Sequence, residues 1–369
     1  MPERKRILII NPFGIGDVLF CTPLIRNLRF YYPDAFIAVA VQKKVAPVLE
    51  NNPYINKVIP FSRGDFKDLS RQSKAKALKL LFKTIAEILR ERFNLYFDLS
   101  LEHRYSLLLK LFGIRPRIGY NYKNRGRFLT HKIDIQGYTD KHVVEYHLGL
   151  LNFLGIKPQF RNLELFLRLG QKDWAKNFLE HKSIKPGDLL VGIAPFGGES
   201  FGAQKESRRW PIENYARLAD LLIDRLNAKI VILAGPKEKE SLKHLFSIMH
   251  NKDKTIDAAE TSITQLASII NNCQIVISND AGPLHLTVAS NIPSVSLFGP
   301  SDEKVYGPYP ANPKHIVLSK DFDCRPCYKY FRLAECRYQR RCLTAITVHE
   351  VFREAERLLN ILNYRMEVA

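Results

Sequence analysis

The chain has 369 residues and a formal net charge of +19, so it is long enough for two domains and should attract a polyanionic partner. Hydrophobic residues make up 46% and charged residues 25%, as in a soluble globular protein. No apolar run reaches the roughly 18 residues of a membrane-spanning helix, and no secretory segment is recognisable, so we expect a cytoplasmic protein.

The first part of the chain alternates apolar strands with amphipathic helices. Strands are predicted at 4–10, 35–42, 95–100 and 117–121, with a further one near residue 60, and helices at 17–32 and 74–93. Residues 121–140 are polar and predicted to be irregular. The alternation of strand and helix predicts a parallel, doubly wound sheet.

The same pattern begins again near residue 188. Strands are predicted at 188–197, 228–235, 274–280 and 293–299, and helices at 212–226, 238–249, 262–273, from 282 and at 348–362. The sequence therefore predicts an α/β protein with two Rossmann-like domains facing across a cleft, where ligands bind at the carboxyl ends of both sheets. We expect domains at 1–165 and 166–346, and a last helix at 347–369 that packs back on the first domain.

The loop after the first strand contains Gly14, Gly16 and Asp17. It lacks the third glycine of a dinucleotide fingerprint and the lysine of a P-loop, and a carboxylate would repel a phosphate. Asp17 is either an N-terminal helix cap or a general base that accepts a proton from an attacking hydroxyl. In the second case, the glycines would let an acceptor approach the main chain closely.

Two loops of the second domain suit an anion. In SNDAGPLHLTVAS, residues 278–290, a strand ends at Asp280 and a helix begins near Gly282, so free main-chain N–H groups and His285 could face a phosphate. The loop 197–211 carries Lys205, Arg208 and a second arginine, which could hold a diphosphate. The alternatives are a capped helix with a core histidine and a solvated surface loop.

These segments together resemble the glycosyltransferase family that includes the ADP-heptose:lipopolysaccharide heptosyltransferases, glycosyltransferase family 9. The resemblance rests on GIGDVLFCTPLIRNLR, on SNDAGPLHLTVASNIPSVSLFGPSD and, more weakly, on RRWPIENYARLA, and it covers nearly the whole chain. It implies the two-domain GT-B fold. It also implies an inverting, metal-independent transfer of heptose from ADP-heptose to the lipid A-linked inner core of lipopolysaccharide, with no cofactor required.

The resemblance also implies roles for residues. Asp17 would be the catalytic base. The donor-binding residues would be Lys205, Arg208, Glu238, Asp280, Ala281, Gly282 and His285, with Glu240 as an alternative to Glu238. The acceptor would lie against Gly14 and Gly16. Arg208 stands where family members often have lysine, which keeps the charge.

The basic stretch RPRIGYNYKNRGRF, residues 115–128, is our candidate for contact with an anionic glycolipid acceptor. Arg115, Arg117 and Arg125 are the predicted acceptor contacts, and the basic helix at 74–93 would add charge. An anionic membrane leaflet attracts such segments, so we expect a cytoplasmic enzyme that is peripheral on the inner membrane. A solvated basic face without a ligand is the alternative.

Four cysteines near the C-terminus, Cys324, Cys327, Cys336 and Cys342, are spaced C-x2-C-x8-C-x5-C. Four thiols so close in sequence could bind a structural zinc ion, or they could be structural without a metal. The nearby Asp321-Phe322-Asp323 could be mistaken for a metal-binding D-x-D, but it does not follow a recognisable strand. Two other functions compete: a GT-B enzyme for another sugar nucleotide or acceptor, and a basic nucleic-acid-binding protein. No nucleic-acid module is recognisable, so nucleic acid is not an expected partner.

Overall fold

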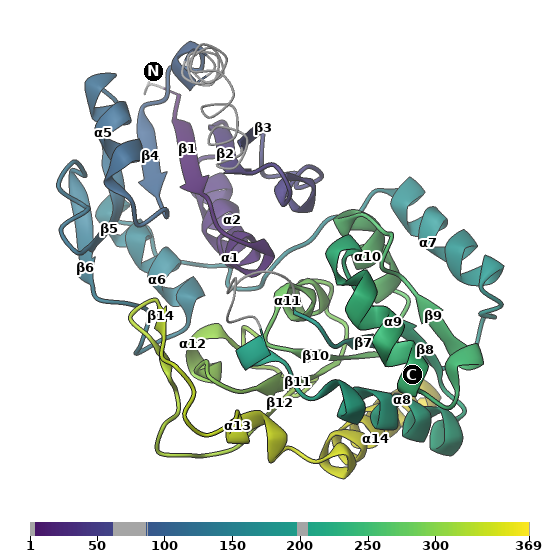
Figure 1. Cartoon of the computed structure of the whole chain (residues 1–369). Coiled ribbons are helices and arrows are strands. Elements are labelled where there is room, and N and C mark those ends of the chain that lie inside the picture. The colour runs from purple at the N-terminus through teal and green to yellow at the C-terminus, as the bar shows by residue number, and fades with distance from the viewer. Residues whose placement is uncertain (1–3, 62–85, 87, 198–205, 369) are drawn as a thin grey trace, which may run out of the picture. The chain divides into compact units, whose positions relative to one another are not determined.

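The computed structural model describes residues 4–61, 86, 88–197 and 206–368, with the main chain only for 362–368. Its internal contacts divide the chain into two compact units (Figure 1). The first contains Met1–Gly137 and Val143–Arg161, and the second contains Tyr138–His142 and Asn162–Ala369. Among the described residues, no helix is both long and apolar enough to cross a lipid bilayer.

A six-stranded parallel sheet is the centre of the first unit. Its strands are β1 (Arg6–Asn11), β2 (Phe36–Gln42), β3 (Lys57–Phe61), β4 (Leu95–Asp98), β5 (Arg117–Tyr122) and β6 (His131–Ile135), in the order β3-β2-β1-β4-β5-β6. The helices described are α1 (Ile15–Phe20), α2 (Thr22–Tyr31), α5 (His103–Leu111) and α6 (Val143–Gly149), with short 3-10 helices at Ala46–Val48 and Leu150–Leu154. Four of the six residues of β1, Ile7 to Ile10, form an apolar run because both faces of a central parallel strand are covered.

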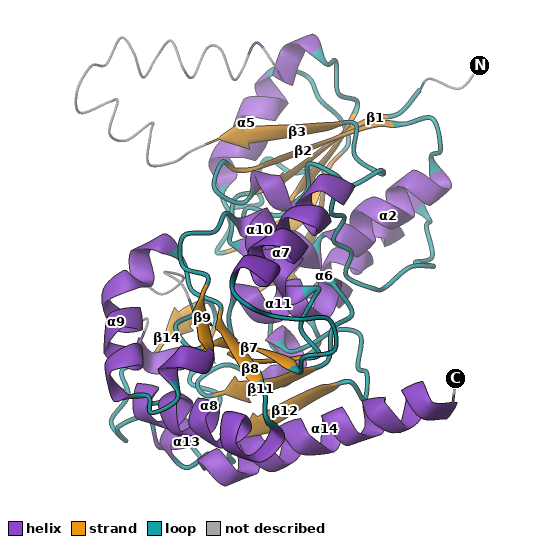
Figure 2. Ribbon diagram, turned by 90° about the vertical axis from the view of Figure 1, so that its right-hand side faces the viewer, coloured by secondary structure: helices purple, strands orange, loops and turns teal. Residues whose placement is uncertain are grey.

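The second unit has the same architecture. Its strands are β7 (Leu190–Ala194), β8 (Lys229–Ile232), β9 (Thr255–Asp257), β10 (Ile275–Asn279), β11 (Ser294–Phe298) and β12 (His315–Ser319), all parallel, in the order β12-β11-β10-β7-β8-β9. Its main helices are α7 (Leu169–His181), α8 (Ile212–Leu226), α9 (Lys239–Ile248), α10 (Ile263–Ile270), α11 (Gly282–Ala289) and α14 (Val348–Val368). Helices α10 and α11 lie on one face of this sheet, and α8 and α14 lie on the other (Figure 2). Shorter elements are α12 (Glu303–Tyr306), α13 (Arg341–Thr344) and the antiparallel pair β13 (Tyr328–Lys329) and β14 (Arg332–Leu333).

Both sheets have the strand order of a Rossmann fold, because counting strands within each unit gives 3-2-1-4-5-6 twice. The order reverses between β1 and β4 in the first unit and between β7 and β10 in the second. Ligands of open α/β sheets bind beyond the carboxyl ends of the strands at such switch points. Each unit therefore has one defined place for a site.

Some predicted elements differ from the observed ones. The expected helix at 17–32 is two helices that meet at Cys21, because Pro23 in the first turn of α2 has no N–H to continue the preceding helix. The stretch expected to be irregular contains the edge strand β6. This strand was not predicted because its polar residues interrupt any apolar run. Strands β9 and β12 were not predicted from the sequence. Most of the predicted helix at 74–93 lies outside the described residues.

The last helix corrects another expectation. We expected it to pack on the first domain, but α14 runs beside α8 in the second unit (Figure 1). Val351, Ala355, Leu358 and Leu359 recur at helical spacing and are buried in the core of that unit, together with Trp210. The amphipathic pattern predicted a packed helix correctly, but it carried no information about which sheet the helix covers.

Candidate active site

At the switch point of the second unit, one asparagine joins two loops. Asn279, the fully buried last residue of β10, accepts a hydrogen bond from the Trp210 main-chain N–H at 3.0 Å and donates one to the Pro195 carbonyl at 2.7 Å. Pro195 directly follows β7, and Trp210 directly precedes the Pro211 N-cap of α8. The described part of the arginine-bearing loop, residues 206–210 (the basic loop), is thereby fixed beside the carboxyl ends of β7 and β10.

Arg208 of the basic loop lies against the end of β10. Its guanidinium forms an ion pair with the carboxylate of Asp280, with 3.2 Å between Nη1 and Oδ2, and the two side chains are only 15% and 5% exposed. The guanidinium carbon also lies 5.3 Å from the ring centroid of Tyr328. The structure thus brings together two predicted donor-binding residues that are 72 positions apart in the sequence.

His285 is buried beside this pair. Burial lowers the pKa of its imidazole to about 4; Asp280 opposes this shift and Arg208 reinforces it. The ring is therefore neutral near pH 7, and it can donate a hydrogen bond but adds no positive charge. The positive charge beside Asp280 and His285 comes from Arg208.

The other predicted donor residues also lie at this edge of the sheet. Ala281 is the extended N-cap of α11, and Gly282 is its first residue. Gly197, after β7, has a φ of +78°, which favours glycine, and a Cβ built there would lie 3.4 Å from the Cβ of Ala281. The loops after β7 and β10 therefore pack closely. Lys205 lies outside the described residues.

The structure separates Glu238 from its alternative. The Glu238 carboxylate accepts a hydrogen bond from the Gly235 N–H at 2.8 Å and lies 3.6 Å from Nη2 of Arg209 in the basic loop. Glu240 is 87% exposed and pairs with Lys243 on the surface of α9. Of these two acidic residues, Glu238 is therefore the one that contacts the basic loop. Arg209 itself is held by the Phe196 carbonyl, Glu206 and Glu238.

In the first unit, Asp17 follows the carboxyl end of β1. Its Oδ2 accepts a hydrogen bond from the Gly14 N–H at 3.2 Å, so the carboxylate caps α1 from the N3 position. The main-chain carbonyl of Asp17 accepts a second bond from the side chain of buried Asn11. Asp17 is only partly buried, and both bonds fix the loop that presents its carboxylate at the switch point of this unit.

A second carboxylate, which was not predicted from the sequence, lies at this switch point. Asp98 is the last residue of β4, is 4% exposed and pairs in register with Ile10 of β1. Its Oδ1 accepts hydrogen bonds from the N–H and the hydroxyl of Ser100. Burial raises the pKa of Asp98 to about 6, although the bonds from Ser100 act in the opposite direction. An aspartate that ends an apolar strand was the sequence signal for this residue.

The predicted acceptor arginines do not lie together. Arg117 is the first residue of β5 and Arg115 lies just before it, at the amino-terminal edge of the sheet, whereas Asp17 follows the carboxyl end of β1. Arg117 is also 3% exposed, and its guanidinium donates to the carbonyls of Ile114 and Phe128. The burial of Arg117 argues against its predicted contact with the acceptor, whereas the exposed Arg115 stays a prediction. Arg125 follows the carboxyl end of β5 and is 40% exposed, with an ion pair to Glu102 at 3.1 Å.

The four C-terminal cysteines are free thiols, with Cys324 and Cys336 exposed and Cys342 buried. Burial and the neighbouring thiols of Cys327, Cys336 and Cys324 raise the pKa of Cys342 to about 11, whereas Arg325 lowers it. Within the described part of the chain, no group of three or more histidine, cysteine or acidic side chains is arranged to hold a metal ion. The predicted zinc site therefore has no support in the arrangement of these thiols.

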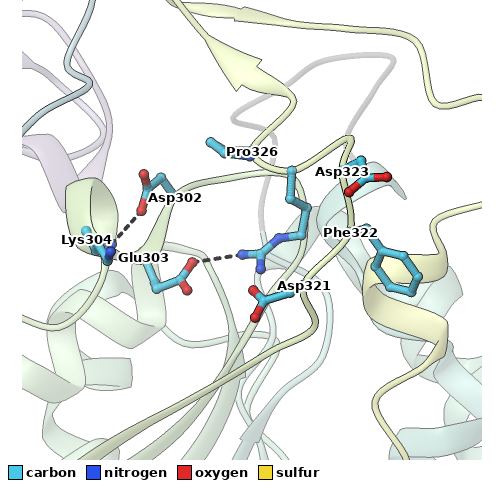
Figure 3. A pocket seen from close by; sticks show the side chains of 8 residues that line it. Asp302, Glu303, Lys304, Asp321, Phe322, Asp323 and Pro326 are labelled. Atoms are coloured by element: carbon cyan, nitrogen blue, oxygen red, sulfur yellow. Dashed lines mark hydrogen bonds and ion pairs between the residues drawn. The ribbon is translucent and has the colours of Figure 1, made fainter.

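A cavity of about 340 Å³ lies beside this cysteine-bearing segment (Figure 3). Asp302, Glu303, Asp321 and Asp323 line it together with Lys304 and Arg325. The Arg325 guanidinium forms an ion pair with Glu303 at 2.8 Å, so one of these carboxylates is already neutralised. Asp321 and Asp323 belong to no metal-holding group among the described residues.

Removing the Asn279 side chain is expected to destabilise the second unit. In Asn279→Ala, the buried Trp210 N–H and Pro195 carbonyl lose their partner, which should lower the free energy of unfolding by about 2–4 kcal/mol. Denaturant unfolding measures this loss. Asn312→Ala is the matched control. Asn312 is exposed, and its side chain accepts a hydrogen bond from the Lys314 main-chain N–H that water can replace. Equal losses in the two variants would contradict the role of Asn279.

Asp98 should make stability depend on pH. Its pKa is about 6 in the folded chain against an ordinary 3.8, so the folded state holds the proton more tightly. Protonated Asp98 therefore adds to the free energy of unfolding below about pH 4, and this contribution is lost as the pH rises through about 6. The loss should be on the order of 2–3 kcal/mol. Asp98→Asn lacks this loss. Urea unfolding at pH 4, 5, 6 and 7 should therefore show the variant gaining on the wild type as the pH rises, and a constant difference would contradict this.

Two Rossmann-type sheets in one chain, each with polar side chains gathered at its switch point, are the arrangement of GT-B glycosyltransferases. The family model of glycosyltransferase family 9 (heptosyltransferase) matches residues 81–337, and the chain belongs to this family. It is thus a glycosyltransferase, as the sequence predicted. The nucleic-acid-binding alternative is set aside.

Known proteins agree with this assignment. The chain is 27% identical over 308 residues to lipopolysaccharide heptosyltransferase 2 of Escherichia coli K12, covering 80% of this chain and 83% of the relative. The crystal structure of a family 9 glycosyltransferase from Veillonella parvula is similar with a TM-score of 0.80 and 25% identity, covering 97% of this chain and 98% of the other. E. coli ADP-heptose lps heptosyltransferase II shares the fold, with a TM-score of 0.74, 24% identity and coverage of 97% and 99%. The predicted GT-B fold is confirmed.

Proposed function

We propose that this enzyme transfers a heptose from ADP-heptose to the lipid A-linked inner core of lipopolysaccharide, with inversion at the anomeric carbon. The heptosyltransferase family and the lipopolysaccharide-acting relative from E. coli support this proposal. The observation that carries it furthest is the buried pair of Arg208 and Asp280 at the switch point of the second unit. A cation held at the carboxyl ends of the strands suits the diphosphate of a sugar nucleotide.

The second unit would hold the donor. Arg208 would contact the diphosphate, and neutral His285 would donate a hydrogen bond to it. The N–H groups of Ala281 and Gly282, at the start of α11, would add partial positive charge. Lys205 belongs to the same loop in the sequence and would add a second cation. Glu238 would accept hydrogen bonds from the nucleoside.

The first unit would hold the acceptor. Gly14 and Gly16 would let the acceptor hydroxyl approach the main chain, and Asp17 would accept its proton. The hydroxyl oxygen then forms a bond to the anomeric carbon while the bond from that carbon to the diphosphate oxygen breaks, and ADP leaves. Arg208 would offset the charge that develops on the leaving diphosphate, so we propose that no metal ion is needed.

We also propose that the enzyme works at the surface of the inner membrane, on its cytoplasmic side. Arg125 lies with the exposed Lys123 beyond the carboxyl end of β5, at the same edge of the sheet as Asp17. This group of cations would attract the anionic acceptor and its leaflet. Arg125 would be the acceptor contact among them.

The test of the proposed reaction is transfer from ADP-heptose to a Kdo-lipid A acceptor, with and without EDTA, alongside a panel of UDP- and GDP-sugars. Among the donors tested, we expect turnover only with ADP-heptose, at a rate that EDTA does not lower. The transferred heptose should have the anomeric configuration opposite to that in ADP-heptose. Turnover with another sugar nucleotide but not with ADP-heptose would show a family 9 enzyme of different specificity. Loss of turnover in EDTA that added metal restores would overturn the metal-independent mechanism.

A further inference from the structure

Residues 324–342, called here the cysteine segment, have no role in the proposed reaction, yet the segment is firmly anchored in the second unit. Arg325, only 6% exposed at its side chain, donates hydrogen bonds to the carbonyls of Gly299, Ser301 and Lys320 and pairs with Glu303. Gly299 directly follows β11, and Glu303, which lines the cavity of Figure 3, begins α12. The segment therefore starts from a fixed point at the carboxyl end of the sheet.

From this anchor the segment reaches the basic loop at two places. The Tyr328 N–H bonds to the Pro300 carbonyl at 3.0 Å, and the Tyr328 ring centroid lies 5.3 Å from the guanidinium carbon of Arg208. Nη1 of Arg340, near the other end of the segment, donates to the carbonyls of Glu206 and Arg209 at 2.8 and 3.4 Å. The main chain is thus held on both sides of Arg208, and the side chain of Arg208 is held by an aromatic ring.

We propose that Tyr328 and Arg340 are positioning residues for Arg208 and that the cysteine segment orients the diphosphate-binding cation of the donor site. This inference rests on the proposed function, in which Arg208 contacts the donor. A guanidinium on a flexible side chain loses rotamer freedom when it binds a phosphate, and prior fixation of that side chain removes part of this loss. An arginine over a tyrosine ring also gains cation–π attraction.

Steady-state kinetics with varied ADP-heptose tests this role. Tyr328→Leu and Arg340→Ala are expected to raise the KM for ADP-heptose by about 3- to 20-fold, with the KM for the acceptor unchanged. Tyr328→Phe keeps the ring and should keep the wild-type donor KM. Tyr338→Leu and Arg337→Ala are matched controls, because both residues are exposed in the same segment, and neither should alter the donor KM.

A double-mutant cycle separates positioning from general stability. In an Arg208→Leu background, Tyr328→Leu should cause no further rise in donor KM, because the group it positions is gone. If Tyr328→Leu raises the donor KM in this background by as much as in the wild type, the inference is overturned. It is also overturned if Arg208→Leu has a raised donor KM while Tyr328→Leu and Arg340→Ala both keep the wild-type value. If Arg208→Leu itself leaves the donor KM unchanged, the proposed donor site fails first, and the positioning role fails with it.

Discussion

Asp17→Asn is expected to lower the rate of heptose transfer by about 10²- to 10⁴-fold while leaving the KM for ADP-heptose nearly unchanged. Asparagine has the size of aspartate but cannot accept the proton of the attacking hydroxyl. It keeps a side-chain oxygen that can accept the hydrogen bond from the Gly14 N–H, so α1 should keep its cap and the loop its shape. The change therefore removes the proposed proton acceptor and little else.

The control for this variant is Asp34→Asn, because Asp34 is an exposed aspartate of the same unit, just after α2. It should transfer heptose at the wild-type rate. Thermal unfolding of both variants should match that of the wild type within a few degrees. If Asp17→Asn keeps a rate within about threefold of the wild type, Asp17 is a helix cap and another group must be the base.

The sequence predicted the repeated α/β architecture because parallel strands that are buried on both faces are apolar runs, as Ile7–Ile10 in β1 shows. It could not predict the edge strands β6 and β9 in the same way. β6 alternates exposed polar residues, and β9 has only three residues, so neither makes an apolar run. Main-chain pairing with an existing neighbour holds both strands, and that pairing is not visible in the local composition.

The candidate site shows the same limit. Motifs placed Asp17 and Asp280 at strand ends, where the structure has them, because a glycine loop or a helix start follows each strand. The ion pair of Arg208 with Asp280 depends on Asn279, which joins the loops after β7 and β10, and no local pattern indicates such a contact. For Arg117, sequence showed a positive charge but not that its guanidinium would be buried on main-chain carbonyls.

Arg208→Leu is expected to raise the KM for ADP-heptose by at least tenfold and also to destabilise the second unit. Asp280 is only 5% exposed, so loss of its partner leaves a buried carboxylate without its counter-charge. We expect the free energy of unfolding to fall by about 2–4 kcal/mol. Arg217→Leu is the matched control, because it removes an exposed arginine from α8 and should affect neither quantity.

Adding Asp280→Asn to Arg208→Leu separates these two effects. The second change removes the unpaired charge, so most of the lost stability should return, measured by denaturant unfolding. The donor KM should stay at least tenfold above the wild type, because the diphosphate still lacks its cation. Recovery of both stability and donor KM in the double variant would mean that Arg208 serves only as the counter-ion of Asp280. Recovery of stability alone would support Arg208 as the group that binds the donor diphosphate.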